Sequence, residues 1–332
     1  MSETAEVDLI LEHARLAPSV HNTQPWSWHV HGRRVDLYAD FRRQLVHADP
    51  QRRDLMISCG AALHHFEVAA RALGWRPRVR RAPRQSEERL VASVLLSPGA
   101  APEDGDSLLE AIAQRRTDRR RLSPWPLPPE RLAALAAAGA AWGAQVVPVP
   151  RNLRTTALAL TRRADEVQQR SSGYVGELNS WTAYWADEGV PVSHIPRQAD
   201  VTSSDVLSRR FRHGVLDDPP VSSQDPADDL LVVCTSSDDT LSRIRAGEAL
   251  SAVWLRATRD GISLVPLSQA VEVPETRRVL QEELLGDTSV GQLLLRVGRA
   301  PEGRKPLPAT PRRELEDIRV THAPARLQAF SP

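Results

Sequence analysis

Residues 17–26 read APSVHNTQPW, and this stretch decides how the rest of the chain is interpreted. An amphipathic run over 7–16 precedes it, and an alternating run over 26–40 follows it. These patterns predict a helix, a proline-broken loop and a strand. In the loop, the amides of Asn22 and Gln24 each present a hydrogen-bond donor beside an acceptor, which matches the polar edge of a heterocycle. A proline-rich corner with Asn and Ser in turn positions is the simpler alternative.

The length and charge of the chain limit its architecture and its partners. A chain of 332 residues is long for one simple core, so two domains or one duplicated domain are expected. The net charge of +1 provides no general field for nucleic acid or for an anionic membrane. Only Lys305 among the 43 basic residues is a lysine, so short arginine runs count as functional signals only where their neighbours also fit.

The two cysteines indicate a reducing compartment. Cys59 and Cys234 stand in apolar stretches without metal-site spacing, so both are expected to be buried, reduced thiols. No apolar run approaches the length of about 20 residues that spans a bilayer, and the N-terminus lacks a signal-peptide pattern. The sequence therefore predicts a soluble cytoplasmic protein.

The remaining periodicity predicts alternating helices and strands. Helices are expected over 49–74, 108–122, 131–143, 151–170 and 245–261, and strands near 78–81, 90–96, 145–149, 229–236, 262–269 and 290–300. Residues 171–226 lack clear periodicity and form a long, partly irregular excursion. It contains Trp181, Tyr184 and Trp185, and these aromatic residues favour a lid over a disordered loop.

Two of the expected helices match each other at a constant offset. Gly60 aligns with Gly247 and Gly74 with Gly261, both 187 positions apart. Chance similarity between alanine-rich helices is the alternative, but the match is typical of two fused copies of one α+β unit. Only the first copy has the Asn and Gln loop, and only the second begins with an arginine-rich run. Together the copies hold one set of binding residues, which predicts a single site at the seam between them.

The pattern PSxxNxQPW resembles the flavin-contacting loop of the nitroreductase fold, and the whole chain resembles the two-halved, Acg-type branch of that family. The resemblance covers about residues 7–318 and is weakest over 171–226. It implies an α+β nitroreductase-like fold, internally duplicated so that one chain mimics a nitroreductase dimer. Its halves are expected over 1–100 and 101–332. Nitroreductase-like enzymes are usually homodimers with FMN at the subunit interface, so a fused chain is expected to be a monomer with one FMN.

The resemblance also implies which arginines hold FMN. The family's Arg-x-Ser-x-Arg/Lys run binds the FMN phosphate and the polar edge of the ring, and it matches Arg115, Thr117 and Arg119. Guanidinium groups bind phosphate in a bidentate manner, and Arg115 near N1 and O2 of the ring is expected to favour reduced FMN. A solvated arginine face at a helix end is the alternative.

The loop and two later segments complete the site that the resemblance implies. Asn22 is expected to pair with the polar edge of the ring, with Gln24 nearby, while Pro18 and Ser19 shape the wall. The family's Pro-x-Glu-Gly segment near flavin N5 and its C-terminal phosphate contact correspond to Pro266, Ser268, Gln269 and Arg312.

The N5 segment departs from the family pattern, because Ser-Gln replaces Glu-Gly. The backbone N–H of Gln269 is still expected to reach N5, but its side chain is expected to narrow access for nicotinamide. For the phosphate contact, Arg312 is preferred to Arg313 and Lys305, and a basic tail that binds nothing is the alternative.

The implied function is FMN-dependent hydride transfer from NAD(P)H to a nitroaromatic, quinone or similar acceptor. Hydride transfer itself needs no side-chain acid or base, so no catalytic residue is predicted. The alternative is an FMN-binding protein with little turnover, covered by a lid over 171–226, and a scaffold without flavin is a third possibility. His64 and His65 are adjacent on a helix and therefore poor joint metal ligands, so they are expected to pack. No metal, nucleic-acid or membrane partner is expected.

Overall fold

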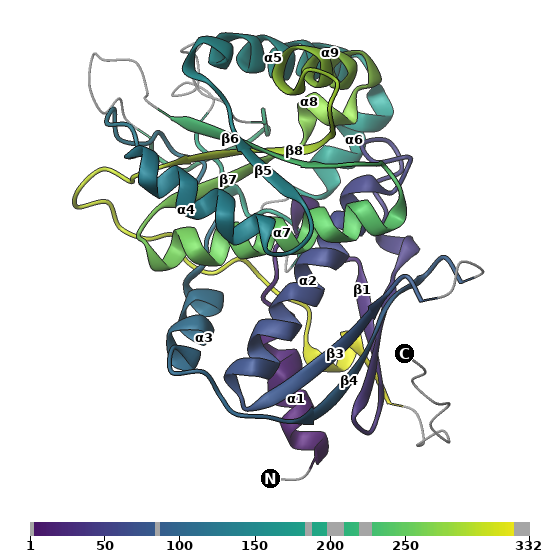
Figure 1. Ribbon diagram of the computed structural model, residues 1–332. Helices are drawn as coiled ribbons and strands as arrows, with labels where there is room; N and C mark the ends of the chain where they lie inside the picture. The colour runs from purple at the N-terminus through teal and green to yellow at the C-terminus, as the bar shows by residue number, and fades with distance from the viewer. Residues whose placement is uncertain (1–2, 84–86, 183–187, 198–208, 219–227, 322–332) are drawn as a thin grey trace.

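The computed structural model describes residues 3–83, 87–182, 188–197, 209–218 and 228–321. Two sheets lie on either side of a pair of long helices, as Figure 1 shows. The first half contains α1 (Glu3–Ala14), β1 (Trp26–His31), β2 (Arg34–Ala39), α2 (Arg53–Ala72), β3 (Trp75–Arg81) and β4 (Leu90–Pro98). The second contains α3 (Gly105–Gln114), α4 (Pro129–Ala140), β5 (Gln145–Pro148), α5 (Arg154–Gln169), α6 (Ser172–Ser180), β6 (Asp229–Thr235), α7 (Thr240–Arg259), β7 (Ser263–Leu267), α8 (Gln269–Glu272), α9 (Pro274–Leu285) and β8 (Val290–Gly298). The described part of the chain ends with α10 (Leu315–Ile318) and β9 (Arg319–Thr321).

Both sheets share one strand order. The first runs β3-β4-β2-β1-β9 and the second runs β7-β8-β6-β5, so each places its own third, fourth, second and first strands side by side. In both, the long helix follows the second strand and the ladders within the unit are antiparallel. The repeat expected from the sequence is therefore present as a repeated topology.

The second sheet is covered on both faces. Helices α4 and α7 pack against one face, and α5, α8 and α9 pack against the other. Every residue of β6 is buried as a result, which explains why its sequence, DLLVVCT, is a continuous apolar run instead of an alternating one.

Helices α2 and α7 join the halves by crossing at their aligned glycines. A Cβ atom added to Gly60 would lie 2.1 Å from the carbonyl oxygen of Ile244, and one added to Gly247 would lie 1.9 Å from that of Ile57. Aligned positions meet again where the Oγ of Ser251 lies 2.7 Å from Nδ1 of His64. Contacts between equivalent residues are expected at an approximate two-fold axis.

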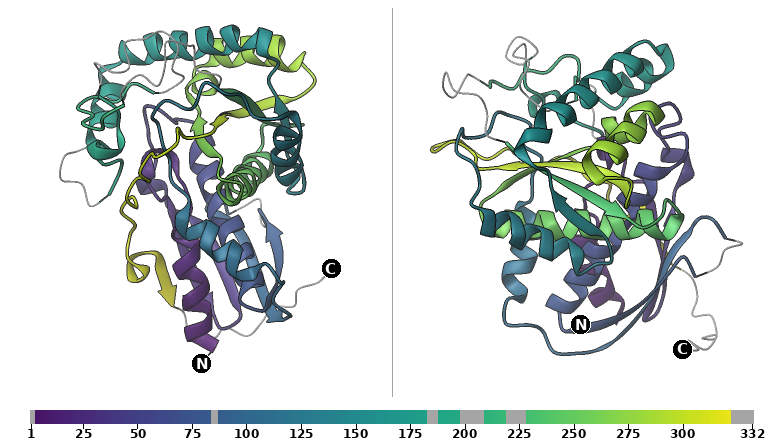
Figure 2. Two further views of the ribbon diagram at one scale, coloured as in Figure 1. Left: turned by 90° about the vertical axis from the view of Figure 1, so that its left-hand side faces the viewer. Right: turned by 45° about the horizontal axis from the view of Figure 1, so that its top comes forward.

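The C-terminal segment returns from the second half to the first. Strand β9 pairs in parallel with β1, and Arg319 forms an ion pair of 2.8 Å with Asp8 of α1. Figure 2 shows this segment running alongside α1. The tail is thus part of the first sheet, contrary to the alternative of a basic tail that binds nothing.

The structure shortens one expected helix and contains helices that were not expected. The helix expected over 108–122 ends at Gln114, and residues 115–122 form a connection without regular structure. Helix α9 was not expected, although Pro274 at its first turn and the left-handed Gly286 at its end are ordinary boundary signals. Helix α6 lies inside the irregular excursion.

Several smaller expectations can be compared with the described residues. Cys59 and Cys234 are buried and unpaired, as expected. His64 and His65 are buried at the helix crossing, so they pack as expected. Tyr184 and Trp185 lie outside the described residues. Among the described helices, none has both the length and the apolar character that crossing a bilayer demands.

Candidate functional site

A cavity lies where the two halves meet. Its volume is about 1000 Å³, counting the part that is open to solvent. Its walls come from the loop after α1, the start of α2, the connection after α3, the middle of α7, the ends of β7 and β8, and the segment before α10. Residues 190, 209 and 211, from the excursion between α6 and β6, complete the lining.

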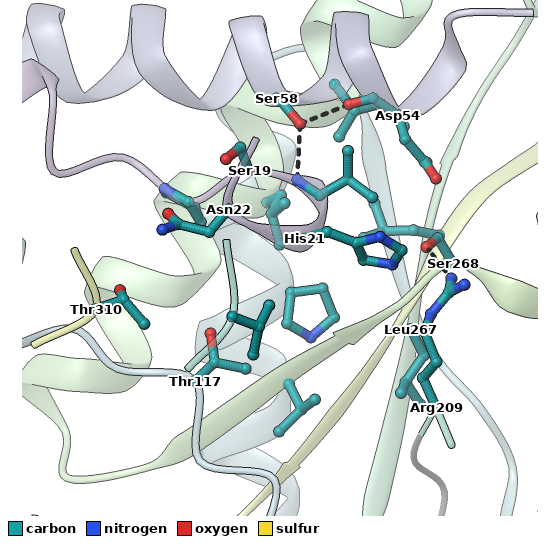
Figure 3. Close-up of a pocket in the computed structure, with 18 of the residues that line it drawn as sticks. Ser19, His21, Asn22, Asp54, Ser58, Thr117, Arg209, Leu267, Ser268 and Thr310 are labelled. Atoms are coloured by element: carbon teal, nitrogen blue, oxygen red, sulfur yellow. Dashed lines mark hydrogen bonds between the residues drawn. The ribbon is translucent and has the colours of Figure 1, made fainter. Parts of the chain in front are cut away.

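Nearly all of the predicted site residues line this cavity. They are Pro18, Ser19, Asn22, Arg115, Thr117, Arg119, Pro266, Ser268, Gln269 and Arg312. These positions are far apart in the sequence, so the fold brings together segments that the sequence could only propose as neighbours. Figure 3 shows Ser19, Asn22, Thr117, Ser268 and Thr310 around the cavity.

Gln24 is the exception, because it does not line the cavity. Its side chain is fully buried, its Oε1 accepts a hydrogen bond of 2.9 Å from the backbone N–H of Arg313, and its Nε2 lies 3.4 Å from the carbonyl oxygen of Asn22. Gln24 thus holds the C-terminal segment against the loop. The direct flavin contact expected for Gln24 does not fit this position.

The loop itself is held in an unusual backbone conformation. His21, Asn22 and Gln24 have φ values of 45°, 56° and 47°, in the left-handed region that non-glycine residues rarely adopt. Ser19 accepts the backbone N–H of Gln24 at 2.9 Å, and Ser58 of α2 accepts that of Val20 at 3.1 Å. The Ser19 hydroxyl thus holds the loop in its conformation, and the Ser58 hydroxyl fixes the loop to α2. Backbone strain of this kind is common at binding sites.

Asn22 connects three segments at the edge of the cavity. Its Nδ2 donates to the carbonyl oxygens of Gly189 and Pro311 at 3.0 and 2.9 Å, and its Oδ1 accepts from Arg312 at 3.0 Å. The amide therefore positions Arg312, and its role toward the flavin ring stays a prediction.

Three arginines give the cavity an excess of positive charge. Within the described part of the chain, Arg115, Arg119 and Arg312 form no ion pair with a carboxylate. Arg115 lies over the ring of Trp254 at 4.4 Å, and Arg119 lies over Phe211 at 5.0 Å.

The pKa values of these three arginines are lowered by burial and by the positive charge of neighbouring arginines. Burial, together with Arg312 and Arg116, lowers the pKa of Arg115 well below its usual value. Burial and neighbouring arginines also lower the pKa of Arg119 and of Arg312 to about 10. The buried Nε atoms of Arg115 and Arg312 have no hydrogen-bond partner in the part of the chain that the structure describes. An anion with several oxygens, such as a phosphate, would satisfy these donors.

The segment expected near flavin N5, residues 266–269, is held by hydrogen bonds on the side that faces α5 and α8. The Nε2 of Gln269 donates to Gln168 at 3.1 Å and to Asp165 at 3.3 Å, so its side chain points toward α5. Ser268 donates to Glu272 at 2.6 Å. The expected narrowing by the Gln269 side chain does not occur, because that side chain is turned away.

Three residues beside Ser268 and the loop after α1 could not be predicted from the sequence. Arg209 forms a buried ion pair with Glu272 and donates to Ser268 at 3.2 Å, and Phe211 packs edge-on against His21 at 5.8 Å. Asp54 of α2 also lines the cavity. Arg209 and Phe211 belong to the excursion without periodicity, and Asp54 is an ordinary residue for a helix start, so only the fold could reveal them.

Comparison with known proteins places the chain in a family, although no protein-family model matches it. The Mycobacterium tuberculosis protein named "Putative NAD(P)H nitroreductase Rv3131" is 38% identical over 317 residues, which are 94% of this chain and 90% of that protein. A second, named acg, is 32% identical over 314 residues, 91% of each chain. The chain belongs to the nitroreductase family.

Among solved structures, this nitroreductase-family chain is similar to the FMN-dependent nitroreductase NfnB of Mycobacterium smegmatis in complex with NADPH. The identity is 18% over 68% of this chain and 99% of that one, with a TM-score of 0.40.

Proposed function

We propose that the chain binds one FMN in the cavity between its halves and transfers hydride from NAD(P)H to a nitroaromatic, quinone or similar acceptor. The observation that carries this proposal is the set of arginines Arg115, Arg119 and Arg312, which line one cavity without a carboxylate partner in the described residues. Uncompensated buried charge is costly, so such a set is best explained by an anionic ligand. Family membership supports a flavin as that ligand.

Arg115 and Arg312 are assigned to the phosphate. The positive charge of Arg312 lowers the pKa of Arg115, and the buried Nε atoms of both have no hydrogen-bond partner among the described residues. Thr310 accepts a hydrogen bond of 2.6 Å from Arg312, and Figure 3 shows Thr117 near Thr310, so both hydroxyl groups lie at this end of the cavity. The pKa of Arg119 is lowered instead by Arg209, which donates a hydrogen bond to Ser268 at the other end of the cavity. We therefore assign the polar edge of the flavin ring to Arg119, and this replaces the expectation that Arg115 stabilises the reduced ring.

Bound FMN would supply the redox chemistry, and the protein would supply position and environment. The apolar side chains of Leu250, Trp254, Val265 and Leu293 line the cavity and would exclude water from the ring. Arg119 would stabilise negative charge on the reduced ring, and Pro18, Ser19 and Asn22 would form the wall on the loop side.

The organisation of the chain is part of this proposal. We divide it into halves over 1–100 and 101–332, with residues 171–226 as the lid, and we infer that the fused halves act as a monomer. A cytoplasmic location is consistent with two buried, unpaired cysteines. The acceptor is a small molecule whose identity is open to screening.

A second function, holding FMN with little turnover, is favoured by one contact. Arg209 links the excursion to Ser268 and Glu272, beside the segment assigned to flavin N5. If the excursion stayed in this position, it would keep the nicotinamide of NAD(P)H away from the flavin ring.

Anaerobic reduction separates these two functions. The purified protein is mixed with NADPH or NADH, and the absorbance of oxidised flavin is followed. Bleaching within seconds, and recovery on adding a quinone or a nitroarene, is the result expected of the oxidoreductase. Bound FMN that is reduced by dithionite but not by either nicotinamide would favour the holding function.

A further inference from the structure

Two buried polar side chains at one end of the cavity have no role in the function proposed above. Asp54 and His21 both line the cavity, and they are only 6% and 7% exposed. Within the described structure, Oδ2 of Asp54 and both ring nitrogens of His21 lack hydrogen-bond partners. Figure 3 shows both side chains near Ser268 and Arg209, away from Thr117 and Thr310. They therefore lie at the end assigned to the flavin ring and not at the phosphate end.

The charges around Asp54 favour a protonated carboxyl group. Glu272 of α8 and Asp49 of the turn before α2 face it with negative charge, whereas Arg209 and Arg53 face it with positive charge. Burial, reinforced by Glu272 and Asp49, raises the pKa of Asp54 well above its usual value. A buried carboxyl group that keeps its proton at neutral pH can act as a general acid.

Neighbouring groups are less suited to that role. Glu272 accepts hydrogen bonds or ion pairs from Arg209, Ser268 and Gln168, so its carboxylate is occupied. Burial, with Arg209 and Arg119 nearby, lowers the pKa of His21 well below its usual value, so its imidazole is neutral. A neutral imidazole can form a hydrogen bond to an acceptor but is a weak proton donor at pH 7.

We propose that Asp54 is the proton donor to the acceptor, with His21 as the second polar contact for the bound acceptor molecule. This inference rests on the proposed function and adds a catalytic residue to it. Bound reduced flavin would supply a hydride, with its two electrons, to a quinone, which would then need one proton to become a hydroquinone. The O–H bond of Asp54 breaks, the proton moves to the anionic oxygen of the reduced acceptor, and water reaching the cavity returns a proton to the carboxylate.

The test isolates proton delivery from electron delivery. Wild-type protein and the D54N variant, both containing FMN, are reduced with dithionite and mixed with 1,4-benzoquinone or with ferricyanide, which takes single electrons and no proton. We expect D54N to slow reoxidation by the quinone by about 100-fold or more and to leave reoxidation by ferricyanide unchanged. D54E should recover part of the quinone rate. D36N is the control, because Asp36 is a buried aspartate that does not line the cavity, and its rates should match those of wild type.

A second readout does not depend on turnover. Infrared spectra of protein labelled with ¹³C-aspartate should contain a protonated-carboxyl band at pH 7 that D54N removes, and the wild-type quinone rate should fall as pH rises while the D54N rate stays flat. Quinone rates that are equal in wild type and D54N, or absence of that band, would overturn the role of Asp54 and leave the proposed function standing. Wild-type protein without bound flavin would overturn the proposed function and this step with it.

Discussion

At the scale of single residues, the arginines of the cavity are the main energetic feature. Arg115, Arg119 and Arg312 line the cavity together with apolar side chains, each has other arginines nearby, and they lack carboxylate partners in the described residues. Their pKa values are lowered by burial and by neighbouring positive charge, which means that the fold holds them at a cost. A bound phosphate would offset that cost, so cofactor binding should stabilise the protein.

Removal of one arginine should weaken FMN binding. For R115Q or R312Q we expect the Kd for FMN to rise roughly 10- to 100-fold, because a hydrogen bond to a charged group contributes about 1.5–3 kcal/mol. The adjacent R116Q is the matched control, since Arg116 does not line the cavity and bonds to nearby backbone oxygens. Fluorescence titration of flavin-free protein measures the Kd of each variant. Equal Kd values for R115Q and R116Q would contradict the assignment of Arg115 to the phosphate.

The histidines at the helix crossing predict a dependence of stability on pH. Burial, with Arg71 and Arg81 nearby, lowers the pKa of His64 to about 3. Between pH 6.5 and 3 the unfolded chain therefore binds a proton at His64 that the folded chain does not. As pH drops below 6.5, His64 should lower the free energy of unfolding by up to about 1.4 kcal/mol per pH unit. Above pH 6.5, His64 should contribute no pH dependence.

Denaturant unfolding of wild type and H64Q at pH 7.5 and pH 5.5 measures this effect. The loss of stability on acidification should be smaller in H64Q, because the substituted side chain does not titrate. An identical loss in both proteins would mean that His64 is not held neutral in the folded state.

The sequence predicted much of the site at this scale, but not all of it. Asn22, Arg115 and Arg312 could be proposed because each stands in a short pattern with a specific order. Gln24 stands in the same pattern, yet its side chain turns toward Arg313. Arg209 enters the site through its buried pairing with Glu272, a contact between residues 63 positions apart in a region without periodicity. No local pattern encodes a contact of that kind.

At the scale of elements, the crossing of α2 and α7 fixes how the halves meet. Gly60 and Gly247 let the two backbones approach so closely that neither position has space for a methyl group. These two residues are one of the two aligned glycine pairs in the sequence, so close packing at the crossing explains why both positions are glycine.

A methyl group at this crossing should disrupt the seam. We expect G247A to lower the free energy of unfolding by several kcal/mol, because its Cβ would lie 1.9 Å from a backbone oxygen that cannot move alone. G176A is the control, since Gly176 lies in helix α6 and nothing is within 4 Å of an added Cβ. That variant should be neutral or about 1 kcal/mol more stable. Equal melting temperatures for the two variants would contradict the described crossing.

The excursion should limit access to the cavity through Arg209. We expect R209Q to increase the rate of flavin reduction by NADPH, by roughly tenfold, because it removes the bonds to Ser268 and Glu272. R210Q is the matched control, since Arg210 is largely exposed and pairs only with Asp165 among the described residues. An R209Q rate equal to that of wild type, with FMN retained, would show that this contact does not gate the site. Stopped-flow absorbance measures the rates.

The expected helix over 108–122 ends early, at Gln114, because repulsion between charged side chains outweighs its helical periodicity. The run over 108–122 has helical periodicity, but five arginines between 115 and 121 would repel one another on a single helix. In the extended connection they separate: Arg120 pairs with Asp118, Arg121 pairs with Asp218, and Arg115 enters the cavity.

At the scale of the whole molecule, the cavity lies between two units of similar topology. Both sheets have the same strand order, and the C-terminal segment crosses back to pair β9 with β1. This crossing brings Arg312 beside Asn22 of the first half. The parallel pairing of β9 with β1 joins segments that are almost 300 residues apart in the sequence, and such long-range pairing leaves no periodic signal.

The stoichiometry of bound FMN tests the central claim most directly. Native mass spectrometry of the full-length chain, together with FMN released on denaturation, gives the number of flavins and of chains in the complex. We predict one FMN in a complex of one chain. Two FMN per chain, one FMN shared by two chains, or no FMN at all would contradict a single site built from both halves.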